Sequence, residues 1–344
     1  MKKYLLLASV AALAFTSCSD QSTEFVGDSA VAKQTREITF APIAKPTTRA
    51  IVEGLTYPGG SSFYVSAFSI PGSGTADEYF SNVSFSKDGS NAWWVGDTKQ
   101  YWPLSPATLN FLAISSSSTI SSFTSAGASI AWTHNASDMD DLMYGTGQGT
   151  VTQTGNALTY GNNVGIVFKH ALAQVAFYVK VGNSAYASDI HITKIALNDM
   201  VTAGTFTLTN STPTTTAAQS ASGVWASTTT ANTDVPGSTT YASTDMSTSL
   251  ALDGQVLVPC KNTSSPFNSF TGFTVYFTIN GNAYTYSYDV PAAEQVLEQG
   301  KKYVYDLTFN LTEIRIAPSV TDWDTDIDGN STADDDIVVA IPGA

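Results

Sequence analysis

The feature that most constrains the fold of this chain is an alternation of apolar and polar residues with a period of two. In the stretch that begins at Gln174, the residues Val175, Phe177, Val179 and Val181 share one face. Successive side chains of a β-strand point to opposite faces of its sheet, so this period predicts strands with one buried side. We expect similar strands at residues 38–40, 62–69, 109–115, 165–168, 190–197, 255–258, 273–279, 283–288 and 303–309.

Turn signals separate these segments, and helical signals are few. Asn280-Gly281 predicts a tight hairpin, because both residues tolerate a positive φ. Only Asp138–Tyr144 and Ala292–Gln299 have enough amphipathic character for a helical turn or two. Charged residues make up 13% of the 344 residues, while Tyr, Phe and Thr suit half-buried pleated surfaces. We therefore predict an all-β chain of β-sandwiches, and its length predicts two domains of roughly 150 residues each.

The N-terminus has the pattern of a lipoprotein export signal. A basic start at residues 1–3 precedes an apolar run at 4–15, and small residues lead to Cys18. The run is shorter than the roughly 20 residues that cross a bilayer. The pattern predicts a signal peptide at residues 1–17 and a mature protein anchored through lipid, palmitate included, on Cys18. The alternative is an ordinary signal peptide in which Cys18 has no role.

Charge and cysteine content limit the partners and the crosslinks. The formal net charge is -14, so nucleic acid and bare anionic membrane are poor partners on electrostatic grounds. Cys260 is the only other cysteine, which leaves the mature chain without a partner for an internal disulfide. Its stability must therefore come from packing.

Two stretches have low sequence complexity. Residues 18–35 mix Ser, Asp, Gln and Thr without an apolar period, which predicts a flexible tether. Residues 205–249 are rich in Thr, Ser and Ala, contain no Lys or Arg, and predict a long loop in which Phe206 and Trp225 pack. Two interpretations of this second stretch remain open: a surface that resists proteases, and a variable insertion without a role.

Several short motifs occur in the order found in one family. They are Arg36–Pro42, Thr47–Ala50, Phe63–Phe68, Tyr101–Pro103, Leu109–Phe111, Asp141–Tyr144, Phe168–Val175, Gly300–Tyr305 and Trp323. Together with the pattern at Cys18, they resemble the Mfa-like fimbrillins, the lipoprotein pilins of type V pili. The resemblance implies two tandem transthyretin-like β-sandwich domains, at residues 36–168 and 169–344. It also implies an outer-membrane lipoprotein that is exposed at the cell surface and then enters a pilus with a role in cell adhesion.

The resemblance implies an activation step and a set of partners. In such pilins a trypsin-like, Arg-specific protease cuts after an N-terminal arginine, and a strand of another pilin subunit replaces the strand that is lost. Here the cut would fall between Arg49 and Ala50 and would release residues 36–49. Arg36 is a second candidate, but a cut there leaves residues 38–40 in place. The alternative is that Arg49 is a surface arginine that is never cut; the adhesion ligand, on a host or bacterial surface, is not indicated.

The end of the chain offers a candidate donor strand. Ile337, Val339 and Ile341 alternate with other apolar residues directly after Asp334–Asp336. Such a strand could close the chain's own C-terminal sandwich or enter the groove of a neighbour. The short tail Pro342–Ala344 favours its own sheet, and a subunit without a long donor strand could still accept one at a pilus tip.

An acidic segment before that strand has the spacing of a calcium loop. Asp324, Asp326, Asp328 and Asp335 fall at positions that supply oxygen ligands to Ca²⁺ in such loops. The last position is Asp rather than a bidentate Glu, and no helices are expected to flank the loop. We therefore expect a solvated acidic linker and no cofactor, with Ca²⁺ binding as the alternative.

Enzymatic signals are weak, and a binding module is the competing hypothesis. The three histidines have no metal-site spacing, and no nucleophile elbow, P-loop or dinucleotide fingerprint occurs. Trp93, Trp94 and Trp102 could instead stack on sugar rings in a surface glycan-binding lipoprotein of an uptake system. Such a protein would not need Arg49. Packing of these tryptophans in a core is the third interpretation, and it is favoured because buried aromatic residues dominate sandwich energetics.

Overall fold

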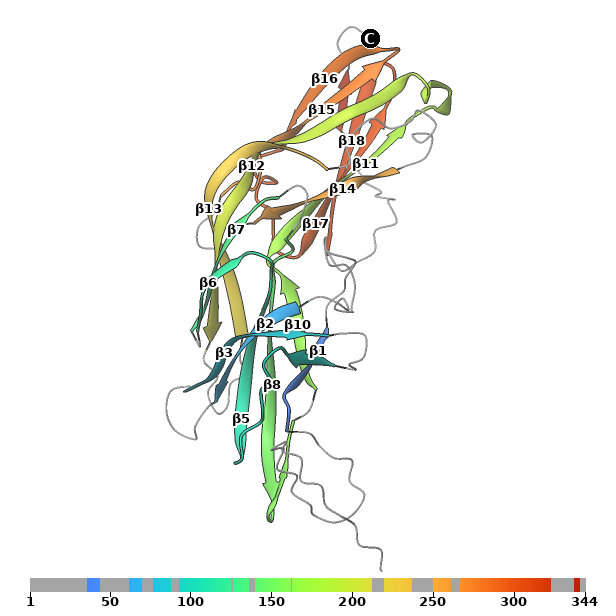
Figure 1. Cartoon of the computed structure of the whole chain (residues 1–344). Coiled ribbons are helices and arrows are strands. Elements are labelled where there is room, and N and C mark those ends of the chain that lie inside the picture. The colour runs from blue at the N-terminus through green and yellow to red at the C-terminus, as the bar shows by residue number, and fades with distance from the viewer. Residues whose placement is uncertain are drawn as a thin grey trace, which may run out of the picture. The chain divides into compact units, whose positions relative to one another are not determined.

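The computed structural model describes residues 36–43, 62–69, 77–87, 93–124, 126–135, 140–161, 163–211, 220–236, 250–260, 267–322 and 337–340. Thr35–Ala344 form one compact unit, built almost wholly from strands (Figure 1). In the described ranges the one helical element is a 3₁₀ turn, η1 (Ser184–Tyr186), where the Asn183 side chain accepts a hydrogen bond from the Ala185 N–H at 2.9 Å. No helix of these ranges is long and apolar enough to cross a membrane. The all-β prediction is confirmed.

The first sheet folds over on itself and encloses a core. Its order is β10-β1-β4-β3-β2-β5-β8-β9, and β10 also pairs with β8, so all of its strands except β9 form a closed circuit. On β10, Val164, Ile166 and Phe168 point inward and the residues between them are exposed. The strands are β1 (Thr39–Ile43), β2 (Ser62–Ser69), β3 (Asp77–Ser86), β4 (Trp94–Gly96), β5 (Ala107–Ser115), β8 (Met143–Thr154), β9 (Ala157–Thr159) and β10 (Val164–His170). The result is a sandwich whose edges are joined.

A row of glycines on β8 permits this closure. Gly145, Gly147 and Gly149 alternate along the strand, and a Cβ on Gly147 would lie 2.7 Å from the carbonyl oxygen of Gly165 on β10. A Cβ on Gly149 would overlap the ring of Trp102. Backbone and tryptophan therefore fill space that side chains would otherwise take, and this is why β8 has no apolar alternation in the sequence.

Two further sheets enclose a second core. The six-stranded sheet has the order β16-β15-β12-β7-β6, with β13 also paired to β12, and the five-stranded sheet has the order β14-β11-β17-β18-β19. Phe273 lies 5.0 Å from Phe177 and 5.1 Å from Tyr305, measured between ring centres. Burial raises the pKa of Tyr305 far above its usual value. The strands are β6 (Thr119–Thr124), β7 (Gly127–Thr133), β11 (Leu172–Val181), β12 (Ile190–Ser211), β13 (Ser220–Asp234), β14 (Leu250–Pro259), β15 (Gly272–Ile279), β16 (Asn282–Asp289), β17 (Lys301–Phe309), β18 (Glu313–Asp322) and β19 (Ile337–Ala340).

A third apolar cluster connects the two halves of the chain. On β5, Phe111 faces the first core, whereas Leu112 packs in a cluster with Phe206 and Trp225. The long strand β12 pairs with β15 along its first part and with β7 along its second (Figure 1). Strands from before residue 168 thus join the six-stranded sheet. The division into domains at residues 36–168 and 169–344 stays a prediction, and this sheet crosses it.

Every strand predicted from alternation is present, and the tight hairpin is confirmed. Asn280 and Gly281 have φ values of 48° and 77° and connect β15 to β16. In this left-handed region Asn and Gly are the residues that adopt the turn most readily.

Two other expectations are corrected. Within the predicted loop at residues 205–249, the described residues 205–211 and 220–234 are strand instead. β12 and β13 pair antiparallel there and bury Phe206 and Trp225, while alternate Thr and Ser residues occupy the exposed face. Neither predicted helical segment is helical where it is described. Met143 and Tyr144 begin β8, and the Glu294 and Gln295 N–H groups donate to the carbonyl of Pro291 in a turn.

Candidate functional site

The first strand occupies an unusual place in the closed circuit. β1 pairs in parallel with β10 at four positions, from Phe40↔Val164 to Ile43↔Val167. On its other side it pairs with β4 at only two positions, and β4 pairs with β3 at two. Pro42 has no N–H to donate to either neighbour. The backbone contacts that hold β1 between its neighbours are therefore few.

The side chains of Phe40 on β1 and of Ile38, directly before β1, are central to the core. Ile38 and Phe40 have no exposed surface. The ring centre of Phe40 lies 4.7 Å from that of Phe85, 5.1 Å from Phe111 and 6.0 Å from Phe63, each in an edge-to-face arrangement. Such pairs contribute about 0.5–1.5 kcal/mol each beyond the area that they bury. Packing against these rings therefore holds β1 in addition to its pairing with β10.

The segment before β1 is fastened to residues 99–102. The Arg36 Nη2 donates to the Trp102 carbonyl at 3.0 Å, and the Trp102 N–H donates to the Arg36 carbonyl at 2.8 Å. The Ile38 N–H donates to the Gln100 carbonyl at 2.8 Å. A protease must bind an extended, accessible backbone, and the backbone at Arg36 is already engaged.

This arrangement has one clear chemical capability. If β1 left, the facing edges of β10 and β4 would expose unpaired backbone groups, and Phe63, Phe85 and Phe111 would form an apolar floor between them. Backbone hydrogen bonds from a new strand would supply affinity there, and its alternate side chains would supply register. The site is suited to binding a β-strand.

Several predicted site residues lie outside the described residues. These are Cys18, Arg49, Ala50, Ile341 and the four aspartates Asp324, Asp326, Asp328 and Asp335, so the roles assigned to them remain predictions. Within the described ranges no group of three or more His, Cys, Asp or Glu side chains could hold a metal ion. Ile337 and Val339 belong to β19, which pairs antiparallel with β18 at the edge of the chain's own five-stranded sheet.

The three tryptophans suggested for glycan contact are not an exposed group. Trp102 is fully buried against Phe111 at 5.9 Å, and Trp94 is 6% exposed with the Lys87 ammonium 4.7 Å from its ring centre. Because both side chains are buried, a sugar could not reach them. Trp93 is 43% exposed.

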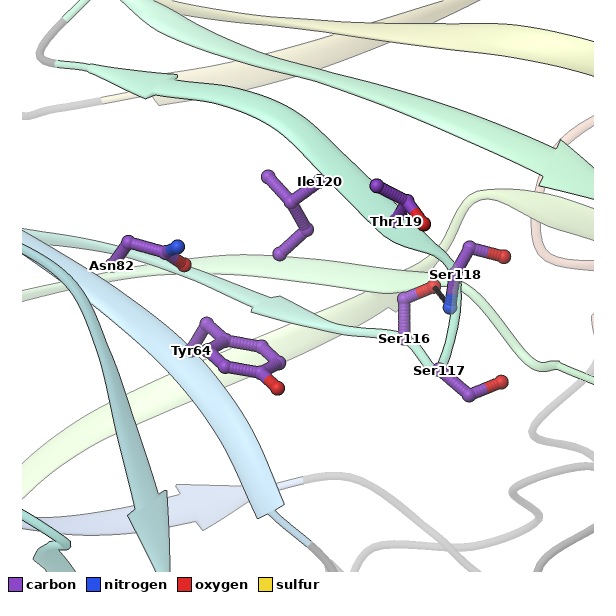
Figure 2. Close-up of a pocket in the computed structure, with 7 residues that line it drawn as sticks. All are labelled: Tyr64, Asn82, Ser116, Ser117, Ser118, Thr119 and Ile120. Atoms are coloured by element: carbon purple, nitrogen blue, oxygen red, sulfur yellow. Dashed lines mark hydrogen bonds between the residues drawn. The ribbon is translucent and has the colours of Figure 1, made fainter.

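A polar pocket that the sequence analysis did not identify lies on the far side of β2 from the first core. Tyr64, Asn82 and residues 116–120 line it, with a volume of about 290 Å³. Figure 2 shows Asn82 on one side of the Tyr64 ring and Ser116–Ser118 on the other. No sequence signal marked this pocket, because it is assembled from β2, β3, the connection between β5 and β6, and the start of β6.

Comparison with known proteins gives the chain its relatives. A family model described as fimbrillin-like matches residues 48–323. A solved structure of a candidate cell adhesion protein from Bacteroides uniformis has a TM-score of 0.51 and 15% identity, covering 83% of this chain and 99% of that one. Another from Bacteroides ovatus has a TM-score of 0.51 and 14% identity, covering 86% and 100%.

A more distant structure also matches, whereas curated protein sequences do not. The C-terminally truncated tip fimbrial protein Mfa3 from Porphyromonas gingivalis matches at a TM-score of 0.41 and 10% identity, covering 83% of this chain and 100% of that one. No curated protein sequence matches this chain. At these identities, the two Bacteroides structures show a shared fold.

Proposed function

The chain belongs to the fimbrillin-like family, and from this premise we propose that it is a pilus subunit that exchanges its first strand for a strand of a neighbouring subunit. Proteins of this family are fimbrial proteins of the cell surface rather than enzymes. The finer steps, which are lipidation, cleavage and strand exchange, form the proposal.

The observation that carries the proposal is the position of β1. Phe40 on β1 and the preceding Ile38 are fully buried, yet β4 pairs with β1 at only two positions. Departure of β1 would leave two free strand edges and an aromatic floor, which is what an incoming strand requires. Another strand that pairs with β10 and brings equivalent side chains can take the place of β1.

Cleavage after Arg49 fits this position better than cleavage after Arg36. A cut at Arg49 separates the whole of β1 from β2, whereas a cut at Arg36 leaves β1 joined to the rest of the chain. The Arg36 side chain and backbone are also hydrogen-bonded to Trp102. We assign the processing site to the Arg49–Ala50 bond and the processing to a trypsin-like, Arg-specific protease.

Export precedes this step in the proposed pathway. The signal at residues 1–17 directs lipidation of Cys18, and residues 18–35 tether the folded unit to the outer membrane. Cleavage after Arg49 then removes the anchor and β1 together. The subunit is thereby released for assembly with other pilin subunits, in a pilus that contributes to adhesion.

Limited trypsin digestion of the chain without its signal tests the proposal, with intact-mass detection and size-exclusion chromatography before and after. We expect a cut after Arg49, besides trimming of the tether after Lys33 that leaves β1 joined to β2. The product should be resistant, and multimers should appear only after the Arg49 cut. Arg49→Ala should remain uncut at this position and monomeric.

The matched control is Arg36→Ala, which removes the other candidate arginine of the N-terminal region. It should be cut after Arg49 and should assemble like the unaltered chain. Normal assembly by Arg49→Ala, or loss of assembly in Arg36→Ala with a normal cut at Arg49, would contradict the assignment.

A further inference from the structure

We propose that the pocket between Tyr64, Asn82 and residues 116–120 is a binding site for a neutral saccharide. Saccharide binding would give the proposed adhesion role a class of ligand, and this part of the inference rests on the proposed function. Strand exchange is not required for it, so the two can be tested separately.

The size and the floor of the pocket suit one sugar ring. Its volume of about 290 Å³ is at the lower limit of small-ligand pockets, which run from roughly 300 Å³ upward. Tyr64 and Ile120 are partly buried and pack against the apolar cluster beneath them. The Tyr64 ring is therefore held in place with part of its surface open, and the apolar face of a sugar can stack on such a ring.

A partly buried hydrogen-bond network prearranges the serine loop of the pocket. The Asp140 carboxylate accepts hydrogen bonds from the Ser116 hydroxyl at 2.6 Å, the Ser117 N–H at 2.7 Å and the Ser118 N–H at 3.1 Å. It also accepts one from the Ser118 hydroxyl. The Asp140 carbonyl in turn accepts from the Trp132 Nε1 at 3.0 Å, which connects the loop to the core. A loop ordered in advance loses little entropy when it binds a ligand.

Three of the residues that line the pocket have exposed polar groups that the fold does not use. Within the part of the chain that the structure describes, the hydroxyls of Ser117 and Thr119 and the side-chain amide of Asn82 take part in no hydrogen bond of the fold. Asn82 has a φ of 53°, and its backbone N–H donates to the buried Ser66 hydroxyl at 2.9 Å, which holds the backbone of Asn82 in place. Two hydroxyls and an amide offer donors and acceptors together, as a sugar hydroxyl requires.

The charge of the lining selects the class of ligand. Among the described residues that line the pocket, none is acidic or basic. The carboxylate of Asp140 is occupied by four donors of the loop. An anionic ligand would find no cation there, and a cationic ligand would find no free carboxylate. A neutral polyol is the complementary ligand.

The pocket also survives the proposed maturation. Its lining begins at Tyr64 on β2, beyond the cut at Arg49, and β1 pairs with β10 and β4 rather than with β2. Loss of β1 therefore removes no residue of the pocket.

Saturation-transfer difference NMR on the uncut chain from Ser19 to Ala344 tests the site. The probes are methyl α-D-mannopyranoside, methyl β-D-galactopyranoside and methyl β-D-glucopyranoside, with N-acetylneuraminic acid as the charged comparator. We expect saturation transfer to at least one neutral glycoside and none to the charged sugar. Absence of transfer to all three neutral glycosides, or transfer to N-acetylneuraminic acid alone, would overturn the proposal and would leave strand exchange untouched.

Variants locate the binding. Ser117→Ala/Thr119→Val removes two exposed hydroxyls that the fold does not use, and Asn82→Gly removes the amide while allowing the positive φ. Each should weaken binding roughly tenfold, as expected for the loss of one or two hydrogen bonds. The control is Thr285→Val, an exposed threonine on β16, at the opposite end of the six-stranded sheet from β6. Unchanged binding in both pocket variants would overturn the assignment.

Discussion

The first and last strands of the described chain are similarly short, but they are placed very differently. β1 lies between β10 and β4 within a closed circuit, and it carries Phe40 into the middle of an aromatic core. β19 lies at the edge of the five-stranded sheet and pairs with β18 alone. Loss of β19 would make β18 the edge strand of the five-stranded sheet. Loss of β1 would open a closed sheet and create two facing edges.

This difference shows what an acceptor site for a strand requires. Affinity comes from unpaired backbone groups, and specificity comes from pockets for alternate side chains. Removal of β1 would supply both features. The backbone groups of β10 and β4 that now pair with β1 would be unpaired, and Phe63, Phe85 and Phe111 would surround the space left by Phe40. The place of β19 supplies a single edge.

The largest effect should come from Phe40→Ala in the uncut chain. It removes the ring at the centre of the cluster, and we expect a loss of about 3–5 kcal/mol of unfolding free energy. Chemical denaturation measures this loss. Ala41→Ser, on the half-buried outer face of β1, is the control and should change stability by less than about 1 kcal/mol. A loss below about 1 kcal/mol for Phe40→Ala would mean that β1 is not an integral part of the core.

An intermediate effect is expected where β8 meets β10 and closes the circuit. Gly147→Ala would place a Cβ 2.7 Å from the Gly165 carbonyl and force the strands apart, at a cost of about 1–3 kcal/mol. Gly165→Ala is the matched control, since its Cβ would meet nothing within 4 Å. Thermal unfolding of the two variants separates them. Equal stability would show that the close approach of the strands is not needed.

The smallest effect should follow deletion of residues 337–344. We expect a cooperatively folded chain with about 1–2 kcal/mol less stability, because one short edge ladder is lost. Denaturation and size-exclusion chromatography after the Arg49 cut give the two readouts. If the shortened chain failed to fold, β19 would be as necessary to the fold as β1, which would contradict the difference described above. A stable fold that no longer assembles would identify β19 as a donor strand.

Much of the fold could be predicted from alternation alone, because β10 buries every second residue and the alternating apolar residues of β11 face the second core. Some strands were missed because their inward positions carry another signal. β8 has glycine at Gly145, Gly147 and Gly149, where a distant strand and Trp102 fill the space. The Thr- and Ser-rich hairpin of β12 and β13 resembles a loop until its partners are known.

The site could be predicted only in part. The motif at residues 36–42 and the arginine at Arg49 indicated a removable strand, and the structure places β1 where its removal would open a groove. The burial of Trp102 could not be predicted with certainty, because it depends on Gly149 and Phe111, which lie on strands distant in the sequence. Nor could the saccharide pocket, whose serine loop is ordered by Asp140 from a later segment.

The most direct test of strand exchange is to lock β1 in place with a disulfide. Ala41 and Gly165 are register partners on β1 and β10, and Gly165 has open space for a Cβ. Paired strands lie roughly 4.8 Å apart, within the Cα separation of roughly 4.4–6.8 Å that disulfides span. Cys260 is fully buried and should not compete. The oxidised Ala41→Cys/Gly165→Cys chain should be cut after Arg49 but remain monomeric, and reduction should restore assembly to the level of the Ala41→Cys control. Equal assembly in the oxidised and reduced states would contradict exchange of β1.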